Sequence, residues 1–250
     1  MSAARKRAVR PETPPERPAR SLTAPVEDYL KAIYELERQG ALDADPRGTR
    51  GGAGATTSEI AERLALSPAS VSGMVRRLAE HGLLAHTRYR GVRLTARGRE
   101  AALRTIRRHR VLEAYLARAL GLPWDRVHEE AERLEHAASD DLIDRMATTL
   151  GEPAVDPHGA PIPRRDGTVD ERRHPTLAQL AVGARARIVM VSDEDADRLR
   201  YLGELGLRPG ASVAIVARAP FDGPISVRTA RGRREIGPAL AAQILVEDGP

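Results

Sequence analysis

The chain has 250 residues, enough for two domains of ordinary size, with 41% hydrophobic residues but only 3% aromatic ones. It contains no cysteine, which excludes disulfides, zinc–thiolate sites and iron–sulfur clusters. The net charge of +5 is modest and nearly all basic residues are arginine, so overall charge is weak evidence for a nucleic-acid partner. No apolar run approaches the ~20 residues of a membrane span, and the start lacks the apolar stretch of a secretory signal. We therefore expect a cytoplasmic protein with aliphatic cores and no membrane partner.

Two segments near the start are expected to lie outside the folded core. Residues 1–24 are basic and proline-rich and are predicted to form a disordered tail. Between these two segments, residues 26–38 place apolar side chains at helical spacing, which predicts a helix. Residues 40–55 are glycine-rich and predict a flexible insertion, because structureless runs of this length are uncommon inside compact domains. No strand precedes its glycines and no Gly-Lys-Ser/Thr follows them, which excludes a phosphate-binding loop.

Residues 57–95 have the order of a winged helix-turn-helix. Thr57 is expected to cap a helix that continues to Leu64, and Pro68 is expected to open a second helix that ends at Gly82. Two short strands, at 83–86 and 92–95, then flank a basic turn. This order predicts a DNA-binding domain over residues 25–97, with the insertion inside it.

The second helix of this pattern carries small side chains, which permit close approach to the major groove of double-stranded DNA. Affinity is expected to come mainly from contacts between arginines and phosphates, with modest base reading and a contribution from DNA shape. The alternative for the two helix arginines is a solvated helix end. The residues expected to contact DNA are Ser67, Pro68, Ser70, Ser72, Arg76, Arg77, Arg88 and Arg90.

Residues 98–151 are expected to be helical and to carry side chains of the types that bind metal ions. One helix is predicted to end near residue 120, and a second to span residues 124–150. His109 and Glu113 are spaced i, i+4 on the first helix. The four residues that share one face of the second helix are His128, Glu132, Glu135 and His136. Converging imidazoles and carboxylates suit a divalent first-row metal; the alternative is a solvated helix face.

The last hundred residues differ from the helical part in composition and in the spacing of their apolar residues. Residues 152–175 contain five prolines and almost no periodic apolar signal, which predicts a linker. From Thr176 short β-runs separated by glycine and proline predict a small β-barrel over residues 176–250, with a short helix near 195–205. The β-runs are at residues 186–191, 212–216, 225–227 and 243–246.

Five motifs follow one another in this chain: EDYLKAIYELE at 27–37, TSEIAERL with SPASVSGMVRRL at 57–78, HRVLEAYL at 109–116, VHEEAERLEHAASD at 127–140 and DPHGAPIP at 156–163. In this order they resemble the diphtheria-toxin-repressor family of metal-dependent bacterial transcription regulators, from about residue 26 to the end. The resemblance implies an α+β protein with an N-terminal winged helix-turn-helix, a helical metal-binding and dimerisation domain, and a C-terminal SH3-like (FeoA-like) domain.

The resemblance also implies two metal sites. One joins the first helix of the DNA-binding domain to the dimerisation helices, with Asp28, Glu132, Glu135 and His136 as ligands. The second uses His109, Glu113 and His128, completed by acceptors from the C-terminal domain. Asp195 is the best candidate for that acceptor. The family often has an amide three residues later, where this chain has Arg198, so Glu194 and Asp197 are the alternatives.

The ligand types bear on which metal is sensed. Iron-sensing members usually have methionine and cysteine at the positions of Asp28 and Glu132, whereas this chain has carboxylates, as in the manganese-sensing (MntR-like) branch. Mn²⁺ is weakest in the Irving–Williams series and prefers oxygen donors. We expect Mn²⁺, with Fe²⁺ as the alternative. Some manganese regulators have a glutamate one turn after the aspartate; Lys31 stands there, so a fully dinuclear site is not expected.

Family members are homodimers, which implies a palindromic operator and repression of metal-uptake genes by the metal-loaded protein. The alternative within the family is an iron-dependent repressor. Outside it, a di-metal hydrolase would use the same ligand types, but the sequence has no nucleophile motif and the chain is not expected to be an enzyme. A third alternative is an architectural DNA-binding protein that needs no metal.

Overall fold

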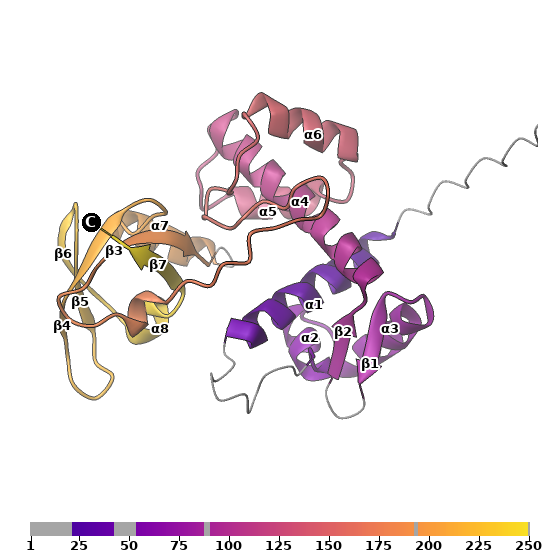
Figure 1. The fold of residues 1–250 in the computed structure, drawn as a ribbon, viewed down its shortest axis with the longest axis horizontal. Helices are drawn as coiled ribbons and strands as arrows, with labels where there is room; N and C mark the ends of the chain where they lie inside the picture. The colour runs from indigo at the N-terminus through magenta and orange to yellow at the C-terminus, as the bar shows by residue number, and fades with distance from the viewer. Residues whose placement is uncertain (1–21, 43–53, 88–90, 193–194, 250) are drawn as a thin grey trace, which may run out of the picture.

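The computed structural model describes residues 22–42, 54–87, 91–192 and 195–249, and within them buried apolar side chains form three hydrophobic cores. The cores belong to an N-terminal lobe, a helical middle lobe and a β-rich C-terminal lobe (Figure 1). Most of the predicted tail and insertion, together with Arg88 and Arg90 of the predicted wing, lies outside the described residues. No helix among the described residues is both long enough and apolar enough to span a membrane.

The N-terminal lobe has the predicted winged helix-turn-helix order. It comprises α1 (Ala24–Leu42), α2 (Thr57–Arg63), α3 (Pro68–Glu80) and the antiparallel hairpin of β1 (Leu84–Thr87) and β2 (Gly91–Leu94). Leu30 and Ile33 of α1 pack in one core with Ile60 of α2 and Leu78 of α3. These four aliphatic residues are almost fully buried, and the same core also buries the rings of Tyr29 and Tyr34.

The helix starts in this lobe are set by side-chain caps. The hydroxyl of Ser67 accepts a hydrogen bond from the Ser70 backbone N–H, and Pro68 occupies the first turn of α3, as predicted. The predicted cap of α2 is wrong by one residue. Thr56, rather than Thr57, forms a capping box with Glu59, because its extended backbone turns its hydroxyl toward the Glu59 N–H.

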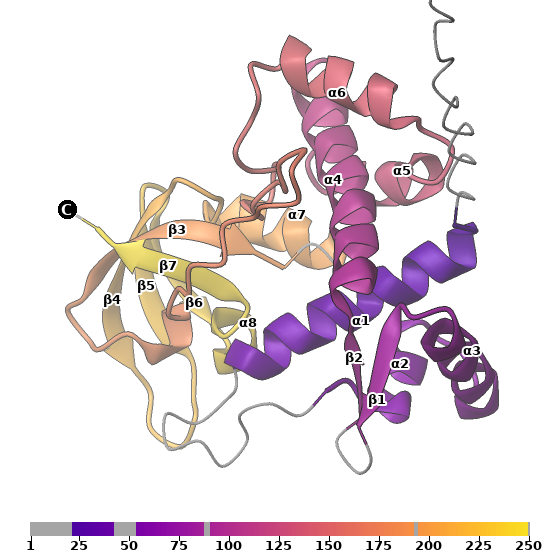
Figure 2. The ribbon, with the colours of Figure 1, turned by 45° about the vertical axis from the view of Figure 1, so that its right-hand side comes forward.

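One long helix, α4 (Ala96–Arg118), belongs to two cores. Its first half contributes Ala102 and Ile106 to the N-terminal core, and its second half contributes Val111 and Ala114 to the middle core. Thr95 caps it, since its hydroxyl accepts a hydrogen bond from the Gly98 N–H. Figure 2 shows α4 crossing α1 and continuing into the middle lobe. Because one helix serves both lobes, a change in the angle between α1 and α4 moves the helix-turn-helix relative to the middle lobe.

The prediction of a single helix over residues 124–150 is wrong. The structure has two helices, α5 (Val127–Leu134) and α6 (Asp140–Thr149), joined by a turn. Ser139 is the reason that α6 starts anew, since its hydroxyl caps the Leu142 N–H. Glu135 and His136 follow the last residue of α5, and the Glu135 N–H still bonds the Ala131 carbonyl as it would in a helix.

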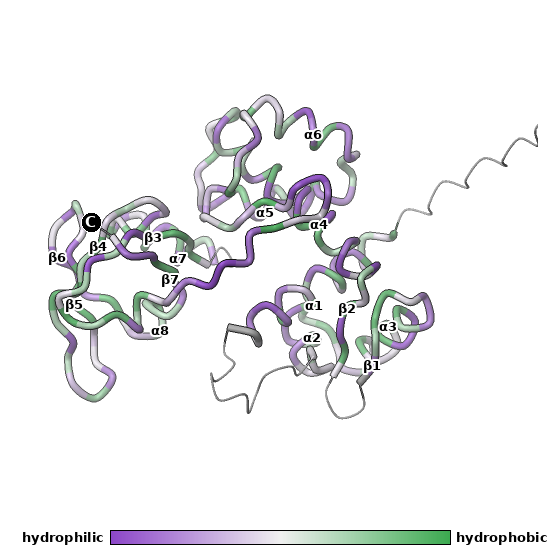
Figure 3. The backbone as a smooth tube through the Cα atoms, in the orientation of Figure 1, coloured by the Kyte–Doolittle hydropathy of each residue, from purple (hydrophilic) through white to green (hydrophobic). Residues whose placement is uncertain are grey.

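The first half of the predicted linker packs against α4. Arg110 donates a hydrogen bond to the Pro161 carbonyl at 2.6 Å, and Arg107 donates one to the Pro163 carbonyl at 2.9 Å. Ile162 is buried in the middle core. Hydrophilic residues 164–174 then lead to the C-terminal lobe (Figure 3).

The C-terminal lobe is a five-stranded antiparallel sheet with the order β6-β5-β4-β3-β7. Its elements are η1 (Leu177–Gln179), β3 (Arg185–Val191), α7 (Ala196–Leu205), β4 (Ser212–Arg218), β5 (Ile225–Thr229), β6 (Gly232–Ile236), α8 (Pro238–Ala241) and β7 (Ile244–Asp248). Strand β6 was not among the predicted β-runs, because charged residues dominate it. In the described part of the chain β6 and β7 are edge strands, so hydrogen bonds do not close the sheet into a barrel.

A side chain from the middle lobe completes the C-terminal core. Trp124 lies in the connection between α4 and α5, yet it is buried with Leu199 and Leu202 of α7. The Arg208 guanidinium lies over its indole ring, 4.5 Å from the centroid. The C-terminal lobe is therefore anchored to the middle lobe directly as well as through the linker.

Candidate metal centre

Side chains of metal-ligand type meet where α1, α4, α5 and the linker come together. Among the described residues, three sets of three ligand atoms each lie within 4.8 Å of one another. We call them the Asp28 group (Asp28, Glu135, His136), the His128 group (His109, His128, Glu132) and the His158 group (Glu113, Asp156, His158).

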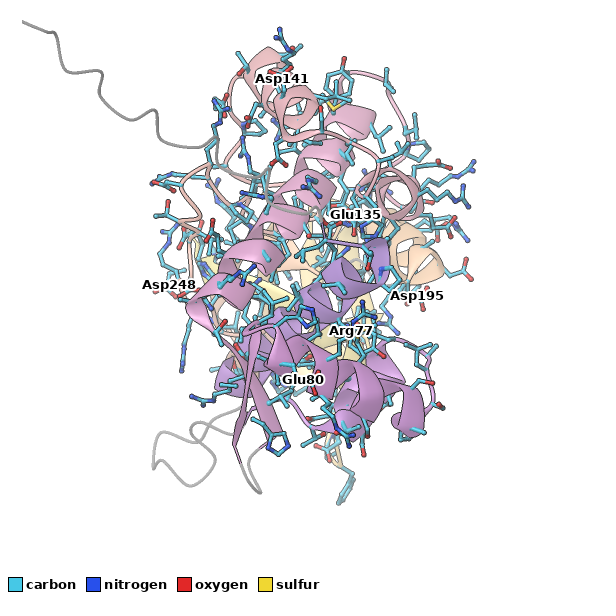
Figure 4. All side chains as sticks on the ribbon, turned by 90° about the vertical axis from the view of Figure 1, so that its right-hand side faces the viewer. Arg77, Glu80, Glu135, Asp141, Asp195 and Asp248 are labelled. Carbon is cyan, nitrogen blue, oxygen red and sulfur yellow. The ribbon has the colours of Figure 1, made fainter. Side chains whose placement is uncertain are left out.

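The Asp28 group connects the N-terminal lobe to the middle lobe. His136 Nε2 lies 2.9 Å from Asp28 Oδ1 on α1 and 3.6 Å from Glu135 Oε1 in the turn. The other ring nitrogen, Nδ1, lies 2.7 Å from Glu27 Oε2. Glu135 is completely buried between the helices (Figure 4). Converging carboxylates around one imidazole form a partial coordination shell for a cation.

Two pKa shifts show the electrostatic state of this group. Burial raises the pKa of Asp28, helped by Glu135 and opposed by His136. Burial disfavours the charged form of His136, but its hydrogen bond to Glu27 and the nearby charge of Asp28 outweigh burial and raise its pKa. Carboxylates crowded together in this way need a positive charge beside them.

The His128 group lies on α4 and α5. His109 Nε2 is 3.0 Å from Glu113 Oε1 and 3.1 Å from His128 Nδ1. On its other side, His109 Nδ1 is 2.5 Å from Glu135 Oε2, so His109 joins this group to the Asp28 group. Burial disfavours the charged form of His109, but Glu113 and Glu135 outweigh burial and raise its pKa to about 10.

Glu132 was predicted to share a site with Asp28, Glu135 and His136, and the structure groups it differently. Its Oε1 lies 3.9 Å from His128 Nε2 and 3.7 Å from His109 Nδ1. The Lys31 ammonium nitrogen lies 2.5 Å from the same oxygen and also contacts Glu135. The Lys31 ammonium thus stands between Glu132 and Glu135.

The His158 group was not predicted. His158 Nε2 donates a hydrogen bond to the Trp124 carbonyl at 2.7 Å, and its Nδ1 lies 3.7 Å from Glu113 Oε1. Asp156 Oδ1 accepts hydrogen bonds from the backbone N–H groups of His158 and Ala160. All three members of the group are buried, and Glu113 Oε2 makes no hydrogen bond with any described residue. A buried carboxylate oxygen without a donor is suited to a cation.

Sequence reasoning passed over Asp156 and His158 although both lie in the motif DPHGAPIP. The signal that could have revealed them is the Asp-X-His spacing, which places two donors in one tight turn. Convergence with Glu113, more than 40 positions earlier, depends on how the linker packs against α4.

Asp195, the predicted acceptor from the C-terminal domain, belongs to none of the three groups of described residues. Its Oδ1 accepts a hydrogen bond from the Arg198 backbone N–H at 3.0 Å and caps α7. Figure 4 places Asp195 on α7, apart from Glu135. Of the two alternatives, Asp197 pairs with Arg200 and Glu194 lies outside the described residues. The assignment of Asp195 as a ligand stays a prediction.

The predicted DNA-contacting residues that the structure describes lie on α3 and the turn before it. All of them are exposed: Ser67, Pro68, Ser70, Ser72, Arg76 and Arg77. An ideal Cβ at Gly73 would meet no atom within 4 Å, so this face of α3 is open. The Ser72 hydroxyl donates to the Pro68 carbonyl at 2.8 Å and lies flat against the helix. The exposed face therefore consists of small residues followed by two arginines.

The donor chemistry of the three groups fits a divalent cation. All donors are carboxylate oxygens or imidazole nitrogens, and the chain has no cysteine that could add a thiolate. Mixed sets of carboxylate oxygens and imidazole nitrogens suit Mn²⁺ and Fe²⁺, which bind such donors without help from sulfur.

Comparison with known protein families divides the chain into three matched regions. Residues 49–92 match the model "Iron dependent repressor, N-terminal DNA binding domain". Residues 95–164 match "Iron dependent repressor, metal binding and dimerisation domain", and residues 176–248 match "FeoA domain". The second match includes Asp156 and His158 as well as the residues of α4 and α5.

Individual proteins are similar over most of the chain. The iron-dependent repressor IdeR of Mycobacterium leprae is 33% identical over 201 residues, covering 76% of this chain and 82% of that protein. The diphtheria toxin repressor of Corynebacterium diphtheriae is 31% identical over 239 residues, covering 92% of this chain and 99% of that protein. A solved structure, a manganese-dependent transcriptional repressor in complex with manganese, is 37% identical with a TM-score of 0.79, covering 90% and 100% of the two chains.

Proposed function

The chain belongs to the iron-dependent repressor family, and on that premise we propose that it is a homodimeric transcriptional regulator that represses metal-uptake genes when it carries metal. The relatives are named as repressors and none of those cited is named as an enzyme. The observation that carries the proposal is the Asp28 group, whose members come from both the helix-turn-helix lobe and the middle lobe.

This placement suggests how metal and DNA binding are coupled. A bound divalent cation supplies the positive charge that the converging carboxylates require. Asp28 holds α1 from one side, while Glu135 and His136 hold the turn after α5, so together they restrict the angle between α1 and α4. In a dimer, a fixed angle allows both α3 helices to meet successive major grooves of a palindromic operator. A coupling free energy of ~1–3 kcal/mol is typical of such linkage.

We propose Mn²⁺ as the sensed metal, with Fe²⁺ as the alternative. The names of similar proteins point both ways, since IdeR is called iron-dependent and the solved structure manganese-dependent. The choice between Mn²⁺ and Fe²⁺ therefore rests on the metal-ligand atoms of this chain. Asp28 and Glu132 are carboxylates, and a site without soft ligands gives the least advantage to metals that bind more tightly than Mn²⁺.

We also propose that His109, Glu113 and His128 hold a second cation, together with Asp156 and His158. Glu113 links these residues, because its Oε1 faces His109 and His128 while His158 approaches from the linker. His158 is hydrogen-bonded to the Trp124 carbonyl, and Trp124 is part of the C-terminal core. Binding of a cation to these residues would therefore tighten the contact between the middle and C-terminal lobes.

For DNA, we propose that α3 enters the major groove. Its small residues permit close approach, and the exposed Arg76 and Arg77 would contact phosphates or base edges. Affinity should then fall steeply with rising salt, because most of it comes from phosphate neutralisation.

The test is capture of genomic DNA fragments by the purified chain at fixed salt, in Mn²⁺, in Fe²⁺ without oxygen, and in chelator. The expected result is selective recovery of palindromic promoter fragments of metal-uptake genes with Mn²⁺ and not with chelator. Equal recovery in all conditions would overturn the proposal in favour of an architectural DNA-binding protein. Selective recovery with Fe²⁺ alone would support the iron-dependent alternative.

Variants make the same test specific to the site. Asp28→Ala should weaken Mn²⁺-dependent operator binding by about 5- to 150-fold, the range that corresponds to the coupling above. Asp141→Ala is the matched control, because Asp141 is an exposed aspartate on α6 outside all three groups (Figure 4). A full metal response in Asp28→Ala would exclude this group as the switch.

A further inference from the structure

Lys31 is unusual both in the sequence and in the structure. It is one of only two lysines among the 40 basic residues, the other being Lys6. It is also buried, with a side chain only 11% exposed. A buried lysine in a chain that otherwise uses arginine suggests a task that a compact, flexible cation performs better than a planar guanidinium.

The position of its ammonium defines that task. Lys31 Nζ lies 2.5 Å from Glu132 Oε1, 3.0 and 3.2 Å from the two oxygens of Glu135, and 3.2 Å from His109 Nδ1. These are members of the Asp28 and His128 groups, so the ammonium contacts atoms that a cation would need as ligands. Lys31 also stands one helical turn after Asp28 on α1, which directs both side chains to the same place.

We propose that Lys31 is a tethered competitor for the metal: its ammonium holds Glu132 and Glu135 in the metal-free protein and must leave before both carboxylates can bind a divalent cation. This inference rests on the proposed function, since it assumes that the Asp28 group binds metal. The consequence is that a higher metal concentration is needed for binding, because part of the affinity of the carboxylates for the metal offsets the loss of their contacts with Lys31.

The structure offers a place for the displaced side chain. A cavity of about 1150 Å³ is lined by Lys31 together with Asp28, Glu35, His128 and Glu132. Glu35 is one turn further along α1 and lies on the same cavity, so its carboxylate can accept the ammonium. Glu35 Oε2 accepts a hydrogen bond from Arg63 at the end of α2 at 2.6 Å. In the metal-loaded protein Lys31 would therefore pair with Glu35, beside the contact that joins α1 to α2.

Direct titration of the metal-free full chain with Mn²⁺, without DNA and at fixed pH and salt, tests this proposal. Lys31→Gln and Lys31→Met should each lower the Kd for Mn²⁺ by about tenfold or more, given the strength of hydrogen bonds to charged groups. The thermal midpoint of the metal-free protein should fall in both variants, because Glu132 and Glu135 lose their cation. An unchanged or increased Kd would overturn the proposal, since a residue that merely orders the ligands would weaken binding when replaced.

Three comparisons sharpen the result. Lys31→Arg keeps the positive charge and should bind Mn²⁺ no more tightly than the unmodified chain. Arg145→Gln removes a different cation, paired with Asp141 on α6 outside the three groups, and should leave the Kd unchanged. Glu35→Gln should weaken Mn²⁺ binding in the presence of Lys31 and have no effect in the Lys31→Gln background. If Glu35→Gln acts equally in both backgrounds, Glu35 is not the acceptor.

The outcomes separate this inference from the proposed function. A lowered Kd in Lys31→Gln together with metal-independent DNA capture would retain the competitor and reject the repressor. The converse result, metal-dependent capture with an unchanged Kd, would reject the competitor alone. If Lys31→Met does not fold, as judged by circular dichroism and by its oligomeric state, the result for Lys31→Gln decides.

Discussion

At the scale of single residues, His109 and Glu113 link the parts of the candidate centre. His109 contacts Glu135 through one ring nitrogen and Glu113 through the other. Glu113 in turn faces His128 and His158. Burial disfavours the charge of Glu113, but His109, His128 and His158 outweigh burial and hold its pKa well below its usual range. In the metal-free protein a charged histidine and a charged glutamate thus stabilise each other in the interior.

These shifts predict a pH dependence for the metal-free protein. The raised pKa of His109 means that its contribution to stability is complete below about pH 6.5 and is lost as pH rises through about 10. The lowered pKa of Glu113 means that its contribution to stability is present above its usual value of 4.5 and is lost as pH falls below it. The free energy of unfolding should therefore differ most between the unmodified chain and His109→Gln at the acidic end of the range from about pH 6.5 to 10. The difference should shrink as pH rises across this range.

Urea denaturation in the presence of a chelator, at several pH values, measures this difference. His81→Gln serves as a control, because His81 is exposed at the end of α3, outside the candidate centre. A difference between the unmodified chain and His109→Gln that is independent of pH would mean that His109 is neutral in the folded protein.

At the scale of secondary-structure elements, the break between α5 and α6 matters most. The helical hydrogen bonding of α5 continues through Glu135, whose N–H bonds the Ala131 carbonyl, and the chain then turns with Glu135 and His136 next to Asp28 on α1. The turn is stabilised where α6 begins, since Ser139 accepts a hydrogen bond from the Leu142 N–H. The helix cap therefore helps to position two of the three members of the Asp28 group.

Removing this cap should have a modest and measurable cost. Ser139→Ala is expected to lower the free energy of unfolding by about 1 kcal/mol, because an N–H at the start of α6 loses its partner. Thr149→Ala is the matched control at the other end of the helix, where the hydroxyl bonds the Arg145 carbonyl and caps nothing. Thermal unfolding of the two variants compares them directly, and equal losses would mean that the cap does not define the start of α6.

At the scale of the whole molecule, Trp124 ties the C-terminal lobe to the middle lobe. It is the only tryptophan of the chain, and it is buried in the C-terminal core although it precedes α5. Two side chains lie against its indole ring. The Arg208 guanidinium carbon of the C-terminal lobe is 4.5 Å from the ring centroid, and the His158 ring of the linker is 5.7 Å away, centroid to centroid. The His158 group is thus adjacent to the contact between the lobes.

Truncating this anchor should loosen the C-terminal lobe. Trp124→Ala is expected to cost about 3–5 kcal/mol, the usual range for a buried tryptophan. Trypsin should then cleave the arginine-containing segment 164–174 faster than in the unmodified chain. Tyr201→Ala, a change at a half-exposed aromatic residue of α7, should leave the cleavage rate unchanged. Equal cleavage rates in Trp124→Ala and the unmodified chain would show that the linker alone holds the lobe in place.

Much of the molecule follows from local sequence pattern. Helical periodicity indicates α1, α3 and α4, and Pro68 indicates where α3 begins. These features depend on side chains within one or two turns of each other, which is the range that periodicity and caps report. The same holds for the ligand types, because the absence of cysteine and the wealth of histidine and carboxylate spacings already indicate a hard or borderline divalent metal.

Tertiary structure decided which of those ligands meet. Packing of the turn after α5 against α1 brought Glu135 and His136 to Asp28, and packing of the linker on α4 brought Asp156 and His158 to Glu113. Lys31 contacts both Glu132 and Glu135, although about 100 positions separate it from them in the sequence. Local sequence pattern does not predict these long-range contacts. They depend on how helices cross and on which buried charges compensate one another once the cores have formed.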